Sequence, residues 1–123
     1  MIRKSIAMAV VFALAGVMYA QEKKTEKLNG FLMDNACLSR HADSDEFAEE
    51  AKKHKVACAL MPDCAASGYA LVAKGKTYKL DAAGNKSAKT ILKGTKTKNG
   101  LRVEVEGTIE GDVLHVDHIA EVF

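Results

Sequence analysis

Long apolar runs are scarce in this sequence: residues 6–17 form one, and no second run follows it. A helix that spans a bilayer needs about 20 apolar residues, so this run is too short to cross a membrane comfortably. It follows Arg3 and Lys4 and precedes the small residue Ala20, which is the layout of an export signal peptide. We therefore expect cleavage to remove residues 1–20 and to leave an exported protein, periplasmic or secreted, with no remaining membrane segment.

A net charge of either sign is also missing from the expected mature chain. The full sequence carries 18 basic and 16 acidic residues, and loss of Arg3 and Lys4 leaves 16 of each. Because nucleic-acid-binding domains usually carry a basic excess, this balance argues against a nucleic-acid partner. Lysines do gather at positions 86, 89, 93, 96 and 98, but such a cluster is typical of a solvated helix and turn.

Several motifs of enzyme active sites are absent from the sequence. It contains no glycine-rich phosphate loop, no serine nucleophile elbow and no cysteine pair with the C-x2-C spacing of disulfide oxidoreductases. His54 lies four residues before Cys58, a spacing at which a helix can pair an imidazolium with a thiolate. An enzyme, specifically a thiol redox enzyme, is therefore the least favoured of three functional hypotheses.

The scarce residue types that carry chemistry gather in one stretch, residues 34–68. This stretch contains all three cysteines, two of the four histidines and the only proline. They are Cys37, Cys58, Cys64, His41, His54 and Pro62. Exported proteins meet an oxidising environment in which cysteines tend to pair. Since three is an odd number, at least one thiol remains for other chemistry or for another chain.

An amphipathic pattern predicts a helix over about residues 44–60. Asp43 and Glu46 have the spacing of a capping box, and Pro62 disfavours continuation of the helix. We expect Lys52 and Lys53 to be exposed. The opposite face, with spacings of four, three, four and three residues, should include buried positions. Its members are Phe47, Ala51, His54, Cys58 and Met61, of which Phe47, Ala51 and Cys58 are expected to be buried.

Alternating apolar residues and turn signals predict five β-strands. They lie near residues 28–33, 69–73, 76–80, 101–109 and 113–119. A loop is expected over residues 81–85 and a short helix over 88–93, between the third and fourth strands. This order is that of an OB-type barrel, with the cysteine-bearing helix inserted between the first two strands. The alternative is an open antiparallel sheet with helices on one face.

The predicted fold class is therefore α+β, mainly β. Residues 21–27 are charged and lack apolar periodicity, which predicts a flexible leader. Residues 28–123 are then a single domain, since the chain is long enough for one domain and not two.

Three segments resemble a family of small exported bacterial proteins of unassigned function. They are HKVACALMPDCAASGYAL at residues 54–71, GKTYKLDAAGN at 75–85 and VEVEGTIEGDVLHV at 103–116. The resemblance implies an exported single domain with a Cys/His-bearing helical insertion on an OB-like β-barrel. It implies no reaction.

A transition-metal site is the first functional hypothesis for the cysteine stretch. The expected ligands are Cys37, His54, Cys58 and Cys64, with His41 and Met61 as substitutes or outer partners. A helix presents a histidine and a cysteine four residues apart on one face, and two flanking cysteines would complete a tetrahedral shell. Such a set suits Zn²⁺, and its soft ligands suit Cu⁺ equally.

A disulfide is the second hypothesis for the same cysteines. Three cysteines allow three single pairings, which the sequence does not distinguish. A bridge from Cys37 to Cys58 or Cys64 would close a loop of about 20 to 30 residues and stabilise the fold by about 3 to 4 kcal/mol. The protein would then be an exported interaction module that binds a protein or a small ligand without a metal.

Overall fold

The computed structural model describes residues 25–40 and 47–123, and the side chain of Phe47 is not included. The predicted signal peptide and His41 lie outside the described residues. The elements are β1 (Thr25–Asp34), α1 (Asn35–Arg40), α2 (Phe47–Lys53), α3 (Val56–Ala59), α4 (Pro62–Ala66), β2 (Tyr69–Ala73), β3 (Lys76–Leu80), α5 (Ala82–Gly94), β4 (Arg102–Glu110) and β5 (Val113–Glu121). None of the helices within these ranges is long and apolar enough to cross a membrane.

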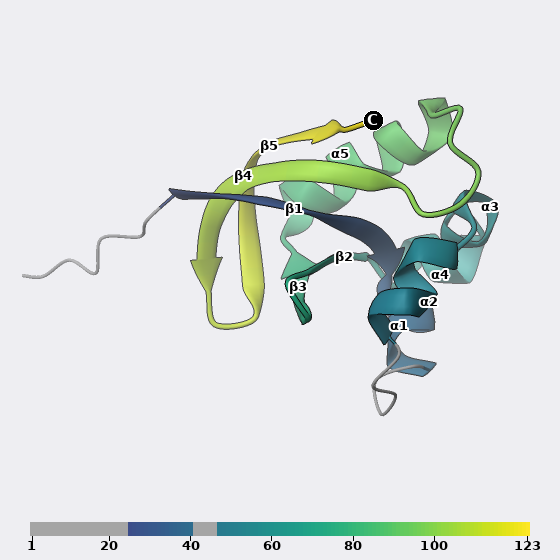
Figure 1. Cartoon of the computed structure of the whole chain (residues 1–123), viewed down its shortest axis with the longest axis horizontal. Helices are drawn as coiled ribbons and strands as arrows, with labels where there is room; N and C mark the ends of the chain where they lie inside the picture. Colours follow the sequence, from purple (N-terminus) through teal and green to yellow (C-terminus); the bar gives the residue numbers. More distant parts are fainter. Residues whose placement is uncertain (1–24, 41–46) are drawn as a thin grey trace, which may run out of the picture.

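The five strands form one mixed sheet that closes into a ring in the order β1-β2-β3-β5-β4 (Figure 1). β1 pairs antiparallel with β4 along residues 25–31 and with β2 along residues 31–34. The one parallel pairing joins β3 to β5 at residues 79–80. The α+β, mainly β class is thereby confirmed, and the sheet is closed rather than open.

The core lies inside the ring because side chains alternate across each strand. On β4, for example, Val103 and Val105 are fully buried, whereas Arg102, which precedes them on the strand, points to solvent and is exposed. Leu28 and Leu32 of β1 extend the same apolar cluster. The helices α1 to α4 gather beyond the carboxyl end of β1, so the cysteine stretch covers that end of the ring (Figure 1).

The helix α5 begins earlier than the sequence predicted, and the expected loop over residues 81–85 is wrong. Asp81 caps the helix, since its side chain accepts a hydrogen bond of 2.8 Å from the backbone N–H of Gly84. A glycine inside a helix, such as Gly84, is less favourable than alanine by about 1 kcal/mol. That glycine is buried, however, and a Cβ there would lie 2.5 Å from Val116 Cγ2, so packing against β5 requires its small size.

The helix predicted over residues 44–60 differs from the structure, in which α2 and α3 are separated at His54 and Lys55. The backbone N–H of Gly100 donates to the carbonyl of His54 at 2.9 Å. Lys55 forms an isolated bridge with Asn99. The carbonyl of His54 thus accepts from Gly100 instead of from the following helical turn, and the N–H of Val56 donates to the carbonyl of Lys98 instead of to α2, which ends that helix.

The burial expected for this segment is only partly observed. Ala51 is fully buried and Lys52 and Lys53 are exposed, as predicted. Cys58 is half-buried, because the break changes which face α3 presents to the core. Val56 and Ala59 of α3 take the buried positions instead.

Gly100→Ala is expected to destabilise the fold by at least about 2 kcal/mol more than Gly75→Ala. Both glycines have positive φ, +63° and +73°. A Cβ at Gly100 would lie 2.2 Å from the carbonyl oxygen of Lys52, whereas one at Gly75 meets nothing within 4 Å. Urea unfolding of the two variants measures the difference. Equal losses would show that the close approach beside the helix break does not matter.

Candidate metal-binding site

The site is built on Asp34, the last residue of β1. Pairing of Asp34 with Tyr69 in the sheet fixes its backbone, and its side chain is fully buried. One carboxylate oxygen, Oδ2, accepts the backbone N–H of Cys37 at 2.9 Å. The other, Oδ1, lies 2.7 Å from Nε2 of His54, which is itself largely buried. These two contacts satisfy a carboxylate that would otherwise be costly to bury.

Asp34 remains ionised in spite of its burial. Burial by itself raises the pKa of this carboxyl, but the hydrogen bonds from the Cys37 backbone and from His54 together outweigh it. The pKa of Asp34 consequently lies below its ordinary value. A fixed negative charge therefore stands at the end of β1 at neutral pH.

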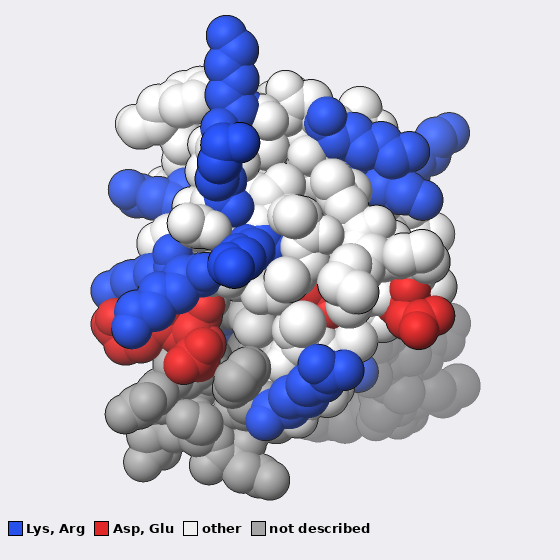
Figure 2. All heavy atoms as spheres, turned by 90° about the vertical axis from the view of Figure 1, so that its right-hand side faces the viewer, with Lys and Arg blue, Asp and Glu red and all other residues white. Residues whose placement is uncertain are grey.

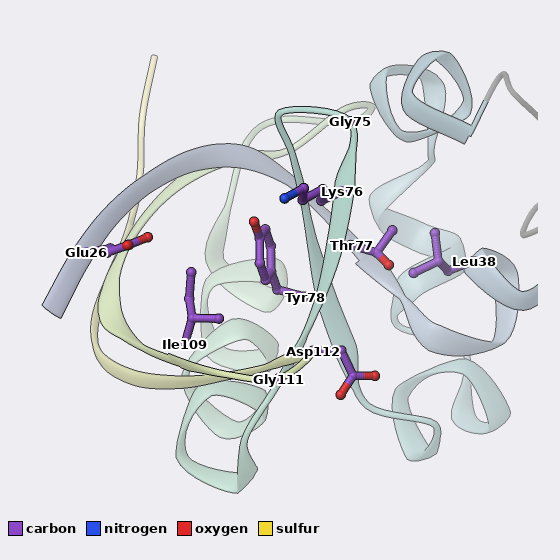
Figure 3. Close-up of a pocket in the computed structure, with 9 residues that line it drawn as sticks. All are labelled: Glu26, Leu38, Gly75, Lys76, Thr77, Tyr78, Ile109, Gly111 and Asp112. Atoms are coloured by element: carbon purple, nitrogen blue, oxygen red, sulfur yellow. The ribbon is translucent and has the colours of Figure 1, made fainter. Parts of the chain in front are cut away.

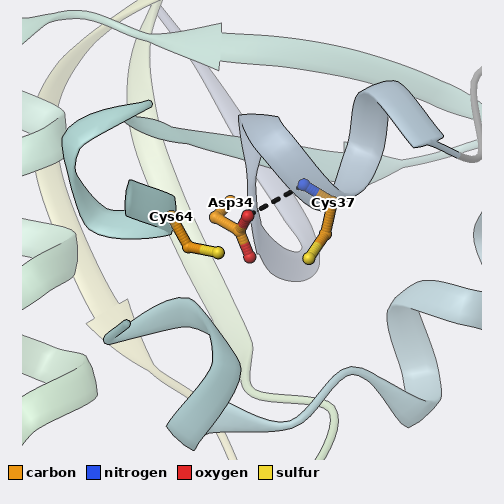
Figure 4. Close-up of side chains that lie close together, drawn as sticks. All are labelled: Asp34, Cys37 and Cys64. Atoms are coloured by element: carbon orange, nitrogen blue, oxygen red, sulfur yellow. Dashed lines mark hydrogen bonds between the residues drawn. The ribbon is translucent and has the colours of Figure 1, made fainter. Parts of the chain in front are cut away.

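Two thiols lie beside this carboxylate, Cys37 from α1 and Cys64 from α4. A carboxylate oxygen of Asp34 and the two Sγ atoms all lie within 4.8 Å of one another. The two cysteines flank the carboxylate in Figure 4. Two helices and the end of a strand thus bring three potential ligand atoms together. None of the three cysteines, Cys58 included, forms a disulfide in the structure.

Hydrogen bonds between α1 and the end of α4 hold the two cysteines in place. The backbone N–H of Asn35 donates to the carbonyl of Gly68 at 2.9 Å, and that of Ala36 donates to Ser67 Oγ at 3.0 Å. Pro62 occupies the first turn of α4, where its missing N–H costs no hydrogen bond. Cys64 follows in the middle of that helix and is buried.

Both thiols are protonated at neutral pH, because the pKa of each is raised. Burial is the main cause that raises the pKa of Cys37 to about 12, and the negative charge of Asp34 adds to it. Burial and the same carboxylate also raise the pKa of Cys64. A ligand that binds these sulfur atoms as thiolates must displace their protons.

The third cysteine and Met61 border the same place. A cavity of about 260 Å³ is lined by all three cysteines and Met61, together with Arg40, Pro62 and Asp63. Met61 stands at its rim, with 56% of its surface exposed. Of the predicted ligands, the structure thus brings Cys37, Cys58, Cys64 and Met61 to one cavity.

His54 is placed differently from the sequence expectation. The break between α2 and α3 separates it from the helix of Cys58, and its Nε2 faces Asp34. Asp34 is the residue that sequence analysis did not select. The available signal was its position, an acidic residue at the end of an apolar strand and three residues before a cysteine.

On the face shown in Figure 2, some lysine and arginine side chains lie together at the left beside acidic ones, and the others are separated from them by uncharged surface. The lysines at 86, 89, 93, 96 and 98 are exposed, as the sequence predicted.

Comparison with known proteins supplies no relative. No protein-family model matches the chain, and no curated protein or solved structure matches it. The chemistry of the site follows from its own residues.

Proposed function

We propose that this protein is an exported binding protein for a soft transition-metal ion, Zn²⁺ or Cu⁺. The observation that carries the proposal is the gathering of Asp34, Cys37 and Cys64, whose ligand atoms lie within 4.8 Å of one another. With Cys58 from the shared cavity, three thiolates and one carboxylate would supply the four ligands of a tetrahedral site. Thiolate ligands favour Zn²⁺ and Cu⁺ over hard cations.

His54 would orient the Asp34 carboxylate rather than bind the ion itself. Its Nε2 already contacts Asp34 at 2.7 Å, and coordination through that atom would break the contact. Hydrogen-bonded partners of this kind fix the orientation of metal ligands and tune their affinity. Met61 offers a thioether at the rim of the cavity, which suits Cu⁺ better than Zn²⁺.

The alternative is a disulfide-stabilised interaction module without a metal. The proximity of Cys37 and Cys64 favours it, because these two thiols are near neighbours in the fold. Thiol redox catalysis is less well supported, since catalytic cysteines have a lowered pKa and the pKa of Cys37 is raised.

For the fold, we infer that the ring is an OB-type barrel. The strand order β1-β2-β3-β5-β4, with α5 between β3 and β4, supports this assignment. The layout of residues 1–20 supports export and cleavage before Gln21.

Mass spectrometry of the exported protein tests location and ligand together. The full chain is expressed with its own N-terminus, recovered from outside the cytoplasm, reduced, and incubated with Zn²⁺ or Cu⁺ in separate samples. We expect a mature mass that begins at Gln21 and a native mass increased by one ion. All three thiols should then be protected from alkylation.

A double variant, Cys37→Ser with Cys64→Ser, is the matched control and should retain no ion. If the wild-type protein binds no ion after reduction and instead readily loses two hydrogens to a Cys37–Cys64 bond, the disulfide module is correct. Retention of residues 1–20 in the recovered protein would contradict export by cleavage.

A further inference from the structure

A second cavity, of about 730 Å³, shares no lining residue with the cysteine cavity, although Leu38 of α1, next to Cys37, borders it. It is bordered by the beginning of β1, by β3 and by the β4–β5 turn. At this end of the closed ring, neighbouring strands are not paired along their whole length. Residues 25–30 of β1 pair only with β4, and β3 pairs with β5 only at residues 79–80. Its volume falls within the range of about 300 to 1,000 Å³ that small-molecule sites occupy.

Four side chains point into this opening in Figure 3: Glu26, Lys76, Tyr78 and Ile109. Tyr78 and Ile109 pack against the apolar core and form the inner wall of the opening. Thr77 also borders the cavity, but its side chain lies on the other side of β3 from Tyr78, as the alternation of side chains along a strand requires. The opening therefore combines an apolar wall with two charged groups of opposite sign.

The two charged groups are left for a ligand. Within residues 25–40 and 47–123, neither Glu26 nor Lys76 forms an ion pair or a side-chain hydrogen bond, with each other or with another residue. Both come from exposed positions on separate strands that border the opening. Tyr78 between them adds an aromatic face and a hydroxyl group.

We propose that this opening binds a small zwitterion with an apolar or aromatic side chain, of the class of free amino acids and very short peptides. The ligand's carboxylate meets Lys76 and its ammonium group meets Glu26, as charge-assisted hydrogen bonds. Its side chain packs against Tyr78 and Ile109, where an aromatic ring gains an offset or edge-to-face contact. This site is independent of the metal proposed above.

Calorimetric titration with three related compounds tests the proposal on the mature protein. L-Phenylalanine carries both charges, phenethylamine lacks the carboxylate, and 3-phenylpropanoate lacks the ammonium group. We expect phenylalanine to bind at least about tenfold more tightly than either analogue, since each loses one charge-assisted contact.

Two charge-neutralising variants assign the contacts. Lys76→Gln should remove the preference for phenylalanine over phenethylamine, and Glu26→Gln should remove its preference over 3-phenylpropanoate. Lys79→Gln, which neutralises an exposed lysine on the same strand but outside the lining of the cavity, should change neither preference. The proposal is overturned if phenylalanine does not bind at millimolar concentration, if the three compounds bind equally, or if Lys79→Gln has the same effect as the charge variants.

Discussion

Cys37 in the native, reduced and metal-free protein is expected to react with iodoacetamide on the order of a thousandfold more slowly at pH 8 than in the unfolded chain. Burial and the Asp34 charge raise the pKa of this thiol from 9.0 to about 12. The reactive thiolate at pH 8 therefore falls from about one molecule in ten to about one in ten thousand.

Pulsed alkylation followed by peptide mass spectrometry measures this reaction from about pH 7 to about pH 11, a range that includes the ordinary pKa of a thiol. Because the folded pKa is raised, the native rate should still be climbing with pH after the unfolded rate has levelled off. Asp34→Asn is the control, since it removes the neighbouring charge and should move the pH profile of Cys37 downward. A native rate that levels off near pH 9, as an ordinary thiol does, would contradict the raised pKa.

Cys64→Ser is expected to weaken Zn²⁺ and Cu⁺ binding by at least about a hundredfold. A serine hydroxyl keeps the size of the side chain but stays protonated, so one thiolate ligand is lost. His54→Ala should weaken binding less, by about tenfold, because it removes only the partner that orients Asp34. Competition with a chromophoric chelator measures each affinity.

Met61→Leu separates the two metals in the same titration. It should leave Zn²⁺ affinity unchanged and weaken Cu⁺ binding, because a thioether is a ligand that Cu⁺ accepts readily. If His54→Ala weakens Zn²⁺ binding as much as Cys64→Ser does, His54 is itself a ligand, and the set inferred from the helical spacing is restored. If Cys64→Ser leaves both affinities unchanged, the site lies elsewhere.

The strands were the part of the fold that the sequence predicted best. The bounds of β2 and β3 agree with the predicted residues 69–73 and 76–80. Both belong to a hairpin whose two-residue turn, Lys74 and Gly75, is a local signal, and alternation along each strand is local too. Prediction was weaker where a distant segment decides the structure, as at the helix break that residues 98–100 impose.

The candidate site was predictable in its cysteines and not in its carboxylate. An acidic residue at a strand end normally faces solvent. Asp34 is instead fully buried where β1 pairs with Tyr69 of β2, and no local pattern in the sequence indicates that pairing. The contact between Asp34 and His54 likewise joins two elements whose distance apart no local pattern encodes. Sequence periodicity therefore selected His54 as a neighbour of Cys58, whereas tertiary packing makes it a neighbour of Asp34.

The pairing of β1 with β2 also decides which cysteines meet during folding. In the unfolded chain, Cys58 and Cys64 meet most often, because the shortest loop has the lowest entropic cost of closure. Once Asp34 pairs with Tyr69, the two ends of the segment from Asn35 to Gly68 are held together. In the folded protein, the Sγ atoms of Cys37 and Cys64 lie within 4.8 Å of each other. If an oxidant acted before that step, a disulfide would form with the local partner, and if it acted afterwards, with the distant one.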